Sequence, residues 1–273
     1  MDRNANSFGP RLRRWRDRRG LSQLALAGEA GTTQRHLSFL ESGRTAPSRA
    51  MVLRLGAALD LPLRQQNALL LAAGFAPAWR QRDLAAPELA QVNRALDFML
   101  AQQEPYPAFV VDRRWNLLRA NAGAGRLTEF LLGPAPPLPP GKPAPPVNLA
   151  EALLAPDALR PFIANWEEIA RFFLRGVQAD AADDGTVETA ELLARLLTFP
   201  GLPALSEGLP PDEATAPVLA MHFRKGETSL NLFTTIATLG TPLDVTLQEI
   251  RVECFFPADE ATAGLMRAWS ARA

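Results

Sequence analysis

The 273 residues leave room for two domains, because a domain usually holds about 100 to 200 residues. With 47% hydrophobic and 21% charged residues, the composition is typical of a soluble globular protein, and no apolar run reaches the roughly 18 residues of a membrane span. The single cysteine, Cys254, excludes a disulfide within the chain, and the first residues lack the apolar core of a secretory signal. We therefore expect a cytoplasmic protein that makes no membrane contact.

The net charge of zero is the sum of two oppositely charged parts. Residues 1–80 hold 13 arginines and 5 acidic residues and so carry a charge of +8. The remaining residues hold 16 basic and 24 acidic side chains and carry −8. Such an asymmetry is expected where only the basic part meets a polyanion, although a chance cluster of solvated arginines is the alternative on charge alone.

Three short helices are predicted in the basic part. The first runs from Pro10 to a stop at Gly20, the second is capped by Ser22, and the third is capped by Thr33. The second and third helices are joined by a tight turn at Gly31. This arrangement is the helix-turn-helix unit, whose second helix can lie in the major groove of DNA.

The third of these helices exposes side chains that are suited to reading bases. Gln34 can pair with adenine, Arg35 with guanine, and the Phe39 ring can touch a thymine methyl, with Ser38 beside them. A structural three-helix bundle without a role in DNA binding is the alternative. Contacts to DNA phosphates are expected from Gln23, Thr33, Arg44, Ser48 and Arg49.

Residues 50–74 are predicted to form two further helices, which are broken at the Leu61–Pro62 step. They complete an all-α, five-helix domain over residues 1–80. Residues 81–104 combine a polar boundary with a connecting helix from Pro87 to Gln103.

Residues 105–273 predict a second domain of the α+β class. Short strands are expected at 107–112 and 114–121, followed by a helix up to residue 132. The proline-rich segment 133–147 favours an extended, poorly ordered loop over a ligand for a proline-reading module. Helices are then expected from Asn148, over 157–180 and over 186–198.

The last third of the chain predicts strands at 216–224, 228–239 and 245–257, and then a helix over 259–272. Two strands, several helices and three strands indicate a five-stranded antiparallel sheet with helices on one face, an arrangement shared by PAS sensor domains. In the last strand, apolar and charged residues alternate. We expect one face to be buried, with Ile250, Val252, Cys254 and Phe256, and the other face to meet water, with Glu249, Arg251 and Glu253.

The helix-turn-helix segment resembles the Xre and phage-repressor family almost position by position, through the string LSQLALAGEAGTTQRHLSFLESGRTAPS. The resemblance implies that Gln34, Arg35, Ser38 and Phe39 read bases and that Gln23 anchors a phosphate.

The same family often pairs an arginine of its first helix with a glutamate late in its third, which here are Arg16 and Glu41. We expect this pair to be structural. In one departure from the family, polar residues commonly stand at the position of Phe39.

Nearly the whole chain resembles the MmyB-like transcription regulators. The strings that carry the likeness are SFLESGR, NALLLAAGFAP, QQEPYPAFVVDRRWNLLRAN, NWEEIARFFLR and FTTIATLGTPLDVTLQEIRVECFFPADEATA. The resemblance implies an Xre-type DNA-binding domain and a PAS-like domain whose pocket takes a long apolar, fatty-acid-like molecule.

Apolar side chains between the sheet and its helices are the candidates for this pocket, although most such residues are ordinary core. For a ligand carboxylate, Arg119, Asn121 and Asn165 are candidate partners. The candidate lining residues are Phe109, Val111, Trp115, Leu117, Phe162, Trp166, Ile169, Phe173, Met221, Phe223, Leu230 and Leu232, of which Trp166 and Phe173 are favoured.

No glycine-rich phosphate loop, nucleophile elbow or metal-ligand spacing is present in the sequence, so we expect no enzyme, no metal site and no cofactor other than a bound lipid. The favoured function is a regulator that binds double-stranded operator DNA as a homodimer under control of a small apolar ligand. The alternative is a regulator whose second domain serves only dimerisation or binding of a protein partner. An enzymatic second domain is the least favoured hypothesis.

Overall fold

The computed structural model describes residues 7–134, 145–184, 186–203 and 218–272. The chain forms two compact units, of which the first comprises residues 1–83 with 239–248 and the second residues 84–238 with 249–273. Within the described ranges, no helix is both long and apolar enough to cross a membrane. The predicted proline-rich loop lies mostly outside these ranges.

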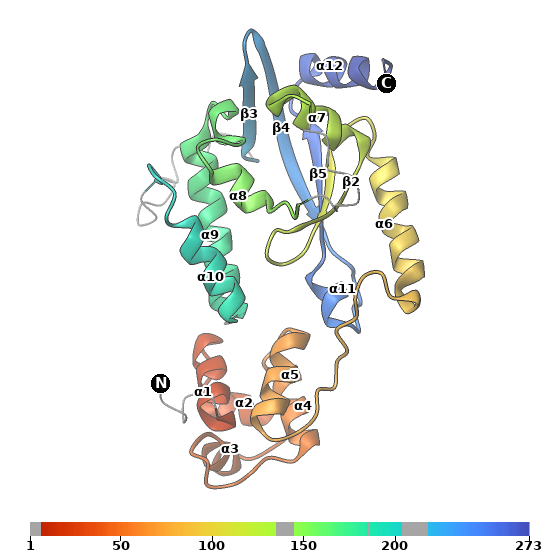
Figure 1. Ribbon diagram of the computed structural model, residues 1–273. Coiled ribbons are helices and arrows are strands. Elements are labelled where there is room, and N and C mark those ends of the chain that lie inside the picture. The colour runs from red at the N-terminus through yellow and green to blue at the C-terminus, as the bar shows by residue number, and fades with distance from the viewer. Residues whose placement is uncertain (1–6, 135–144, 185, 204–217, 273) are drawn as a thin grey trace. The chain divides into compact units, whose positions relative to one another are not determined.

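The first unit contains the five predicted helices, which are labelled in Figure 1. They are α1 (Phe8–Arg18), α2 (Gln23–Glu29), α3 (Gln34–Glu41), α4 (Arg49–Ala58) and α5 (Leu63–Ala72). The hydroxyl groups of Ser22 and Thr33 accept hydrogen bonds from Ala25 N and His36 N, which confirms both predicted caps. Every helix buries leucine in one core: Leu12, Leu26, Leu37, Leu40, Leu55, Leu69 and Leu70.

Helices α1 and α3 approach each other so closely that one position requires glycine. A Cβ atom on Gly9 would lie 2.4 Å from the carbonyl oxygen of Glu41, well inside any packing distance. Because that oxygen belongs to the backbone, it cannot rotate away as a side chain could. Gly9 therefore sets the spacing of the two helices.

The segment 239–248 leaves the second unit between two strands and packs within the first. Its Asp244 is buried and accepts a hydrogen bond from Arg82 with an Nη1 to Oδ2 distance of 2.7 Å. The backbone N–H of Val245 donates to the carbonyl of Arg80 at 2.8 Å. The predicted domains of 1–80, 81–104 and 105–273 had placed this segment in the second domain.

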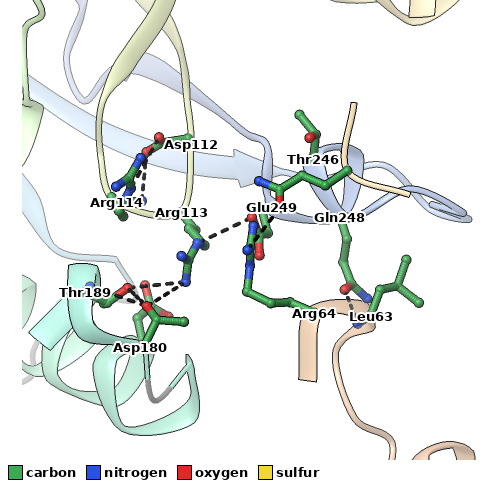
Figure 2. Close-up of polar contacts among 12 residues, drawn as sticks. Leu63, Arg64, Asp112, Arg113, Arg114, Asp180, Thr189, Thr246, Gln248 and Glu249 are labelled. Atoms are coloured by element: carbon green, nitrogen blue, oxygen red, sulfur yellow. Dashed lines mark hydrogen bonds and ion pairs between the residues drawn. The ribbon is translucent and has the colours of Figure 1, made fainter. Parts of the chain in front are cut away.

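Gln248 of this segment completes the N-terminus of α5. Its Oε1 atom accepts a hydrogen bond from Leu63 N at 2.6 Å (Figure 2). Pro62, which precedes α5, has no side-chain oxygen and cannot cap the helix itself. The missing acceptor comes instead from a residue 185 positions away in the sequence.

The strand predicted at 245–257 is wrong in its first third. Residues Val245–Glu249 form helix α11, and strand β5 begins only at Arg251. The β-rich composition suggested a strand, but the Asp244 carboxylate accepts a hydrogen bond from Thr246 N at 2.9 Å and so starts a helical turn.

The second unit is built on the predicted five-stranded antiparallel sheet, whose strand order is β2-β1-β5-β4-β3. The long central strands β4 and β5 pair with Thr234 opposite Phe255, and β1 pairs with β5. The strand bounds are β1 (Ala108–Val111), β2 (Leu117–Ala120), β3 (Ala220–Lys225), β4 (Thr228–Ala237) and β5 (Arg251–Pro257).

Both faces of the sheet carry helices, whereas the sequence suggested one covered face. Helix α6 (Ala90–Gln102), preceded by the short η1 (Pro87–Leu89), contacts β1 and buries Leu96 and Leu100. In Figure 1 it lies on the side of the sheet away from α8, α9 and α10. The remaining elements are α7 (Ala122–Leu132), α8 (Leu149–Leu154), η2 (Arg160–Phe162), α9 (Trp166–Asp184), α10 (Val187–Leu196) and α12 (Glu260–Ser270).

The helix predicted over 157–180 is interrupted. Ile163 is extended and forms a β-bridge with Phe223, and Ala164 N donates to the carbonyl of His222 at 2.7 Å. Helix α9 therefore begins only at Trp166, because the backbone of this segment is bonded to β3 and not to a helical turn.

The exposure predicted for β5 is also wrong. Glu253 is only 9% exposed, and its register partners on the two neighbouring strands are Phe109 and Ile236. Alternation correctly separates Arg251 and Glu253 from Val252, but it does not tell which set faces water. Because helices cover both faces, neither set does.

Candidate DNA-reading helix and ligand pocket

Helix α3 buries one side and presents the predicted base-reading residues on the other. Leu37 and Leu40 are buried, while Gln34 and Arg35 are exposed and Ser38 and Phe39 are partly exposed; Glu41 closes the helix in a buried position. The eight-residue length and the short turn before it are those of a helix that can enter the major groove.

Two guanidinium groups lie near the Phe39 ring. The Cζ atom of Arg35 is 5.4 Å from the ring centroid and that of Arg44 is 5.7 Å away. At these distances the ring attracts both cations and restricts their orientation. A polar residue, which is common at this position in the family, would not offer this aromatic face to Arg35 and Arg44.

The Arg16 and Glu41 side chains form the ion pair that the resemblance implied. Arg16 Nε donates to Glu41 Oε1 at 2.6 Å and Nη2 to Oε2 at 3.1 Å, and both residues are buried. Gln23 Nε2 donates to the same carboxylate at 2.9 Å. The hydrogen bond from Arg16 to Glu41 raises the arginine's pKa. The pair thus links α1, α2 and α3.

The predicted phosphate-binding residues fall into two kinds. Arg44 and Arg49 are exposed, as a phosphate contact requires. Thr33 and Ser48 cap α3 and α4, where each hydroxyl oxygen accepts a backbone N–H at 3.2 Å. Gln23 begins α2 with an amide N–H already donated to Glu41.

The second unit contains a cavity of about 380 Å³ between the sheet and helices α7 to α9, within the usual range for small-molecule sites. Of the predicted lining residues, Phe109, Trp115, Ile169, Phe173, Met221, Phe223 and Leu232 line it. The further lining residues are Leu127, Thr128, Leu131, Leu149, Leu153, Leu159, Phe172, Gly176, Asp180, Leu219, Thr234, Ile236, Arg251, Glu253 and Phe255.

The other predicted pocket residues lie elsewhere. Trp166 donates its indole N–H to the carbonyl of Leu153 at 3.2 Å, and the Arg160 guanidinium stacks 3.6 Å from its ring centroid. These contacts give Trp166 a structural role. Val111, Leu117, Phe162 and Leu230 also do not line the cavity.

The predicted partners for a ligand carboxylate are engaged in the fold. Arg119 bonds to Asn93 and Asp97 of α6, Asn121 caps α7 through Ala124 N, and Asn165 bonds to the backbone of β3. None of the three lines the cavity.

Three charged residues line the cavity among the described residues: Asp180 of α9 and Arg251 and Glu253 of β5. Arg251 Nη2 is 2.7 Å from Asp180 Oδ2. Burial raises the pKa of Glu253 to about 7, and the charge of Arg251 opposes this shift. The sequence analysis missed Arg251 and Glu253 because alternation assigned the charged residues of β5 to water, and it gave no signal for Asp180 on α9. No group of side chains that could hold a metal ion occurs in the described ranges.

Trp115 enters the cavity from an unusual backbone conformation. Its φ of +65° is rare for a bulky residue, and the preceding turn is held by the Asp112 carboxylate, which accepts from the N–H groups of Arg114 and Asn116. The indole packs 4.5 Å from the Phe173 ring and under the Arg251 guanidinium. This strained turn places an aromatic wall beside the charged end of the cavity.

Arg113 of the same turn is held in place by an ion pair of its own. Its Nε atom is 3.4 Å from Glu249 Oε2 (Figure 2). Nη1 also lies 3.3 Å from the hydroxyl groups of Thr186 and Thr189. The turn is thereby fixed to α10 and to the residues that precede β5.

Comparison with known families agrees with this two-part arrangement. Residues 7–69 match the family model described as a helix-turn-helix domain, and residues 92–268 match that of the MmyB-like transcription regulator ligand binding domain. The second model is, by its description, a domain of transcription regulators. The comparison with curated proteins gave no match. Because the second model spans more than half of the chain and covers the sheet, helices and cavity described above, the chain belongs to the family of MmyB-like transcription regulators.

Proposed function

We propose that this DNA-binding regulator changes its affinity for a specific operator when a long apolar, fatty-acid-like molecule occupies the cavity of the second unit. The observation that carries the proposal is the path of the chain between β4 and β5. Both strands line the cavity, and the segment that joins them packs in the helix-turn-helix unit.

The cavity has the character expected of a site for such a molecule. Its lining is mostly apolar, and helix α9 follows it from Ile169 to Asp180, a rise of about 16 Å at 1.5 Å per residue. Phe172 and Ile236 are 62% and 52% exposed although they line the cavity, so the opening is also apolar. A long hydrocarbon chain with one polar end suits this shape.

The connection between the strands supports control of DNA binding by the ligand. Thr234 and Ile236 line the cavity shortly before residue 239, and Arg251 lines it shortly after residue 248. Between them, Asp244 and Gln248 are bonded within the first unit. A ligand that shifts the ends of these strands acts on the segment that caps α5. If the ligand binds one arrangement of this segment more tightly than another, the difference between the two binding free energies is the free energy that couples ligand binding to DNA binding.

On the DNA side, we propose that α3 enters the major groove and that Gln34, Arg35, Ser38 and Phe39 read bases. Arg44 and Arg49, with Gln23, Thr33 and Ser48, would contact phosphates. A homodimer in the bacterial cytoplasm is part of the proposal, because helix-turn-helix domains commonly bind two half-sites one helical turn apart.

The test is a measurement of operator affinity by fluorescence anisotropy, with a duplex selected from a randomised pool. We expect saturated C12 to C16 fatty acids to change the affinity of the full chain at least fivefold. In Gly176→Leu, a side chain is added at the cavity lining, and the response should be lost while affinity without ligand is kept.

Gly125→Leu is the matched control, since Gly125 is also a helical glycine with open space where a Cβ atom would lie, but it does not line the cavity. It should respond like the unmodified chain. Equal operator affinity with and without every such ligand would contradict ligand control and favour a second unit that serves only dimerisation or partner binding.

A further inference from the structure

Two buried polar groups in the cavity lining have no partner in the described parts of the chain. Trp115 is 7% exposed, and its indole N–H is buried and donates to no acceptor. Glu253 is 9% exposed, and its carboxyl group takes part in no hydrogen bond or ion pair. Both residues line the cavity. Because buried polar groups are normally paired, two such groups in one cavity indicate a ligand that pairs with them.

The two groups lie at the same end of the cavity. The Arg251 guanidinium is 5.6 Å from the centroid of the Trp115 ring. Glu253 follows two residues later on β5, so its side chain points to the same face, about 7 Å further along the strand. A ligand head group between Trp115 and Glu253 can therefore contact both.

Glu253 can act as a donor because it holds a proton near neutral pH. Burial raises its pKa to about 7, and the charge of Arg251 opposes this shift. Arg251 is itself paired with Asp180 of α9, the other acid of the lining within the described ranges. The lining residues that β1, β4, α7 and α8 contribute there carry no charge. Cys254, the next residue of β5, points to the opposite face of the sheet.

A carboxylate supplies what the two groups lack. An indole N–H can only donate, and a protonated carboxyl group offers one O–H donor. A carboxylate has two oxygens, one for each donor, and hydrogen bonds to an ionised acceptor are about twice as strong as neutral ones. An alcohol has a single oxygen, and an ammonium group has no acceptor for the indole. If Glu253 is ionised, it repels the ligand, so binding draws a proton onto the pair of carboxyl groups.

We propose that Trp115 and protonated Glu253 form the head-group subsite of the cavity, and that they hold the carboxylate of a long-chain fatty acid between the indole N–H and the carboxyl O–H. Binding then takes up one proton where Glu253 was ionised beforehand, and none where it was already protonated. This rests on the proposed function, because it assumes that a fatty-acid-like molecule occupies the cavity. It refines that function by naming the residues that recognise the head group and by making ligand affinity fall as pH rises.

The experiment is isothermal titration calorimetry at pH 6 and pH 8, with the full chain titrated into dissolved dodecanoate or dodecanol. Free dodecanoate is ionised at both pH values, so a change in its affinity reports a group of the protein. We expect dodecanoate to bind about tenfold more weakly at pH 8 and to take up about one proton there, as linkage to a group with a pKa of about 7 requires. Two buffers of different ionisation enthalpy measure this proton. Dodecanol affinity should change less than threefold.

Two variants separate recognition of the head group from a structural effect. Glu253→Gln keeps a neutral N–H donor at every pH, so dodecanoate should bind equally well at both pH values and take up no proton. Trp115→Phe keeps an aromatic ring without the N–H. Dodecanoate should lose at least tenfold in affinity, and dodecanol at most about fivefold, because hydrogen bonds to charged groups contribute more.

The matched controls remove the same groups elsewhere in the second unit. Glu129→Gln changes an exposed acid of α7, and Trp269→Phe changes a half-buried indole of α12. Neither residue lines the cavity, so both variants should bind dodecanoate like the unmodified chain, with the same pH dependence.

Three results would overturn the proposal. Equal dodecanoate affinity at pH 6 and pH 8, without proton uptake, would show that Glu253 donates no hydrogen bond to the head group. A pH dependence that persists in Glu253→Gln would assign it to another group. An equal loss of both ligands in Trp115→Phe would leave the indole a packing role only. Absence of binding by both ligands at both pH values would overturn the proposed ligand control as well, which separates the two failures.

Discussion

Two buried carboxylates, one in each unit, have the same exposure and opposite surroundings. Glu41 and Glu253 are both 9% exposed. Glu41 accepts hydrogen bonds from Arg16 and Gln23, whereas Glu253 has no such partner within the described ranges. A partnered buried charge joins helices and serves the fold. An unpartnered one in apolar surroundings has a raised pKa, so that the stability of the fold depends on pH.

Removal of the partner of Glu41 gives the largest expected effect. Arg16→Ala leaves a buried, uncompensated carboxylate and should lower the free energy of unfolding of the first unit by about 3 to 5 kcal/mol. Urea unfolding followed by circular dichroism measures the change. Arg13→Ala is the control, because the Arg13 side chain is 69% exposed in its pair with Asp17 and should contribute less than about 1 kcal/mol.

The double substitution Arg16→Met with Glu41→Leu sharpens this test. If an unpaired charge is the cause, removal of both charges should restore most of the lost stability, since well-packed apolar residues often replace buried pairs without loss. Equal destabilisation in the single and the double variant would instead assign the effect to lost packing around α1.

The unpartnered carboxylate predicts a stability that falls as pH rises. The pKa of Glu253 is about 7 in the folded protein against 4.5 for the free group, so between these values the folded state holds the proton more tightly. Raising the pH from about 4.5 to 7 should therefore remove up to about 3 kcal/mol of stability from the second unit. Among the described residues, Arg251 and Asp180 are the other charged groups that line the same cavity.

Urea unfolding at pH 5 and pH 8 checks this dependence. Glu253→Gln has no proton to release, so its stability should change less over this interval than that of the unmodified chain. Glu129→Gln, which changes an exposed acid of α7 that does not line the cavity, should retain the full slope. An identical slope in the Glu253→Gln variant would assign the pH dependence to other groups.

The difference between the two carboxylates also shows which features of the structure could be predicted from the sequence alone. The caps at Ser22 and Thr33 and the pair of Arg16 with Glu41 depend on local motifs or on a strong family likeness, and they were predicted. Glu253 was placed in water, because period-two alternation identifies the residues that share a face but not what covers that face. The second cover, helix α6, is remote in sequence from β5.

Contacts over long sequence distances account for most of the other differences. The bridge of Ile163 with Phe223 interrupts a helix that its own residues favour. The position of residues 239–248 depends on Arg80, Arg82 and Leu63, which lie more than half the chain away. No local pattern encodes such pairs, whereas the five-stranded antiparallel sheet was predicted from the order of the β-rich and helical runs along the chain.

Arg35 and Arg49 of the first unit are exposed to water, and the proposed function gives each of them a contact with DNA. Arg35→Ala should weaken operator binding by about 1 to 3 kcal/mol and relax sequence preference at one base pair. Arg49→Ala should weaken binding to all sequences and reduce the salt dependence by about one unit of slope. Anisotropy titrations with the operator and its point variants at two salt concentrations measure both. Uniform loss in both variants would contradict the separate roles.

The smallest expected effect concerns Gln248, whose side chain caps α5 and which lies in the segment proposed to carry the ligand signal. Gln248→Ala removes the acceptor for Leu63 N and should lower the stability of the first unit by about 1 kcal/mol, the usual contribution of a helix cap. Because residue 248 ends the segment that joins the cavity strands to the first unit, the ligand-induced change in operator affinity should also shrink. Gln91→Ala, at an exposed position of α6, should alter neither quantity. A full ligand response in Gln248→Ala would mean that this cap plays no part in coupling, and that the signal depends on the Asp244 pair with Arg82 or on another path.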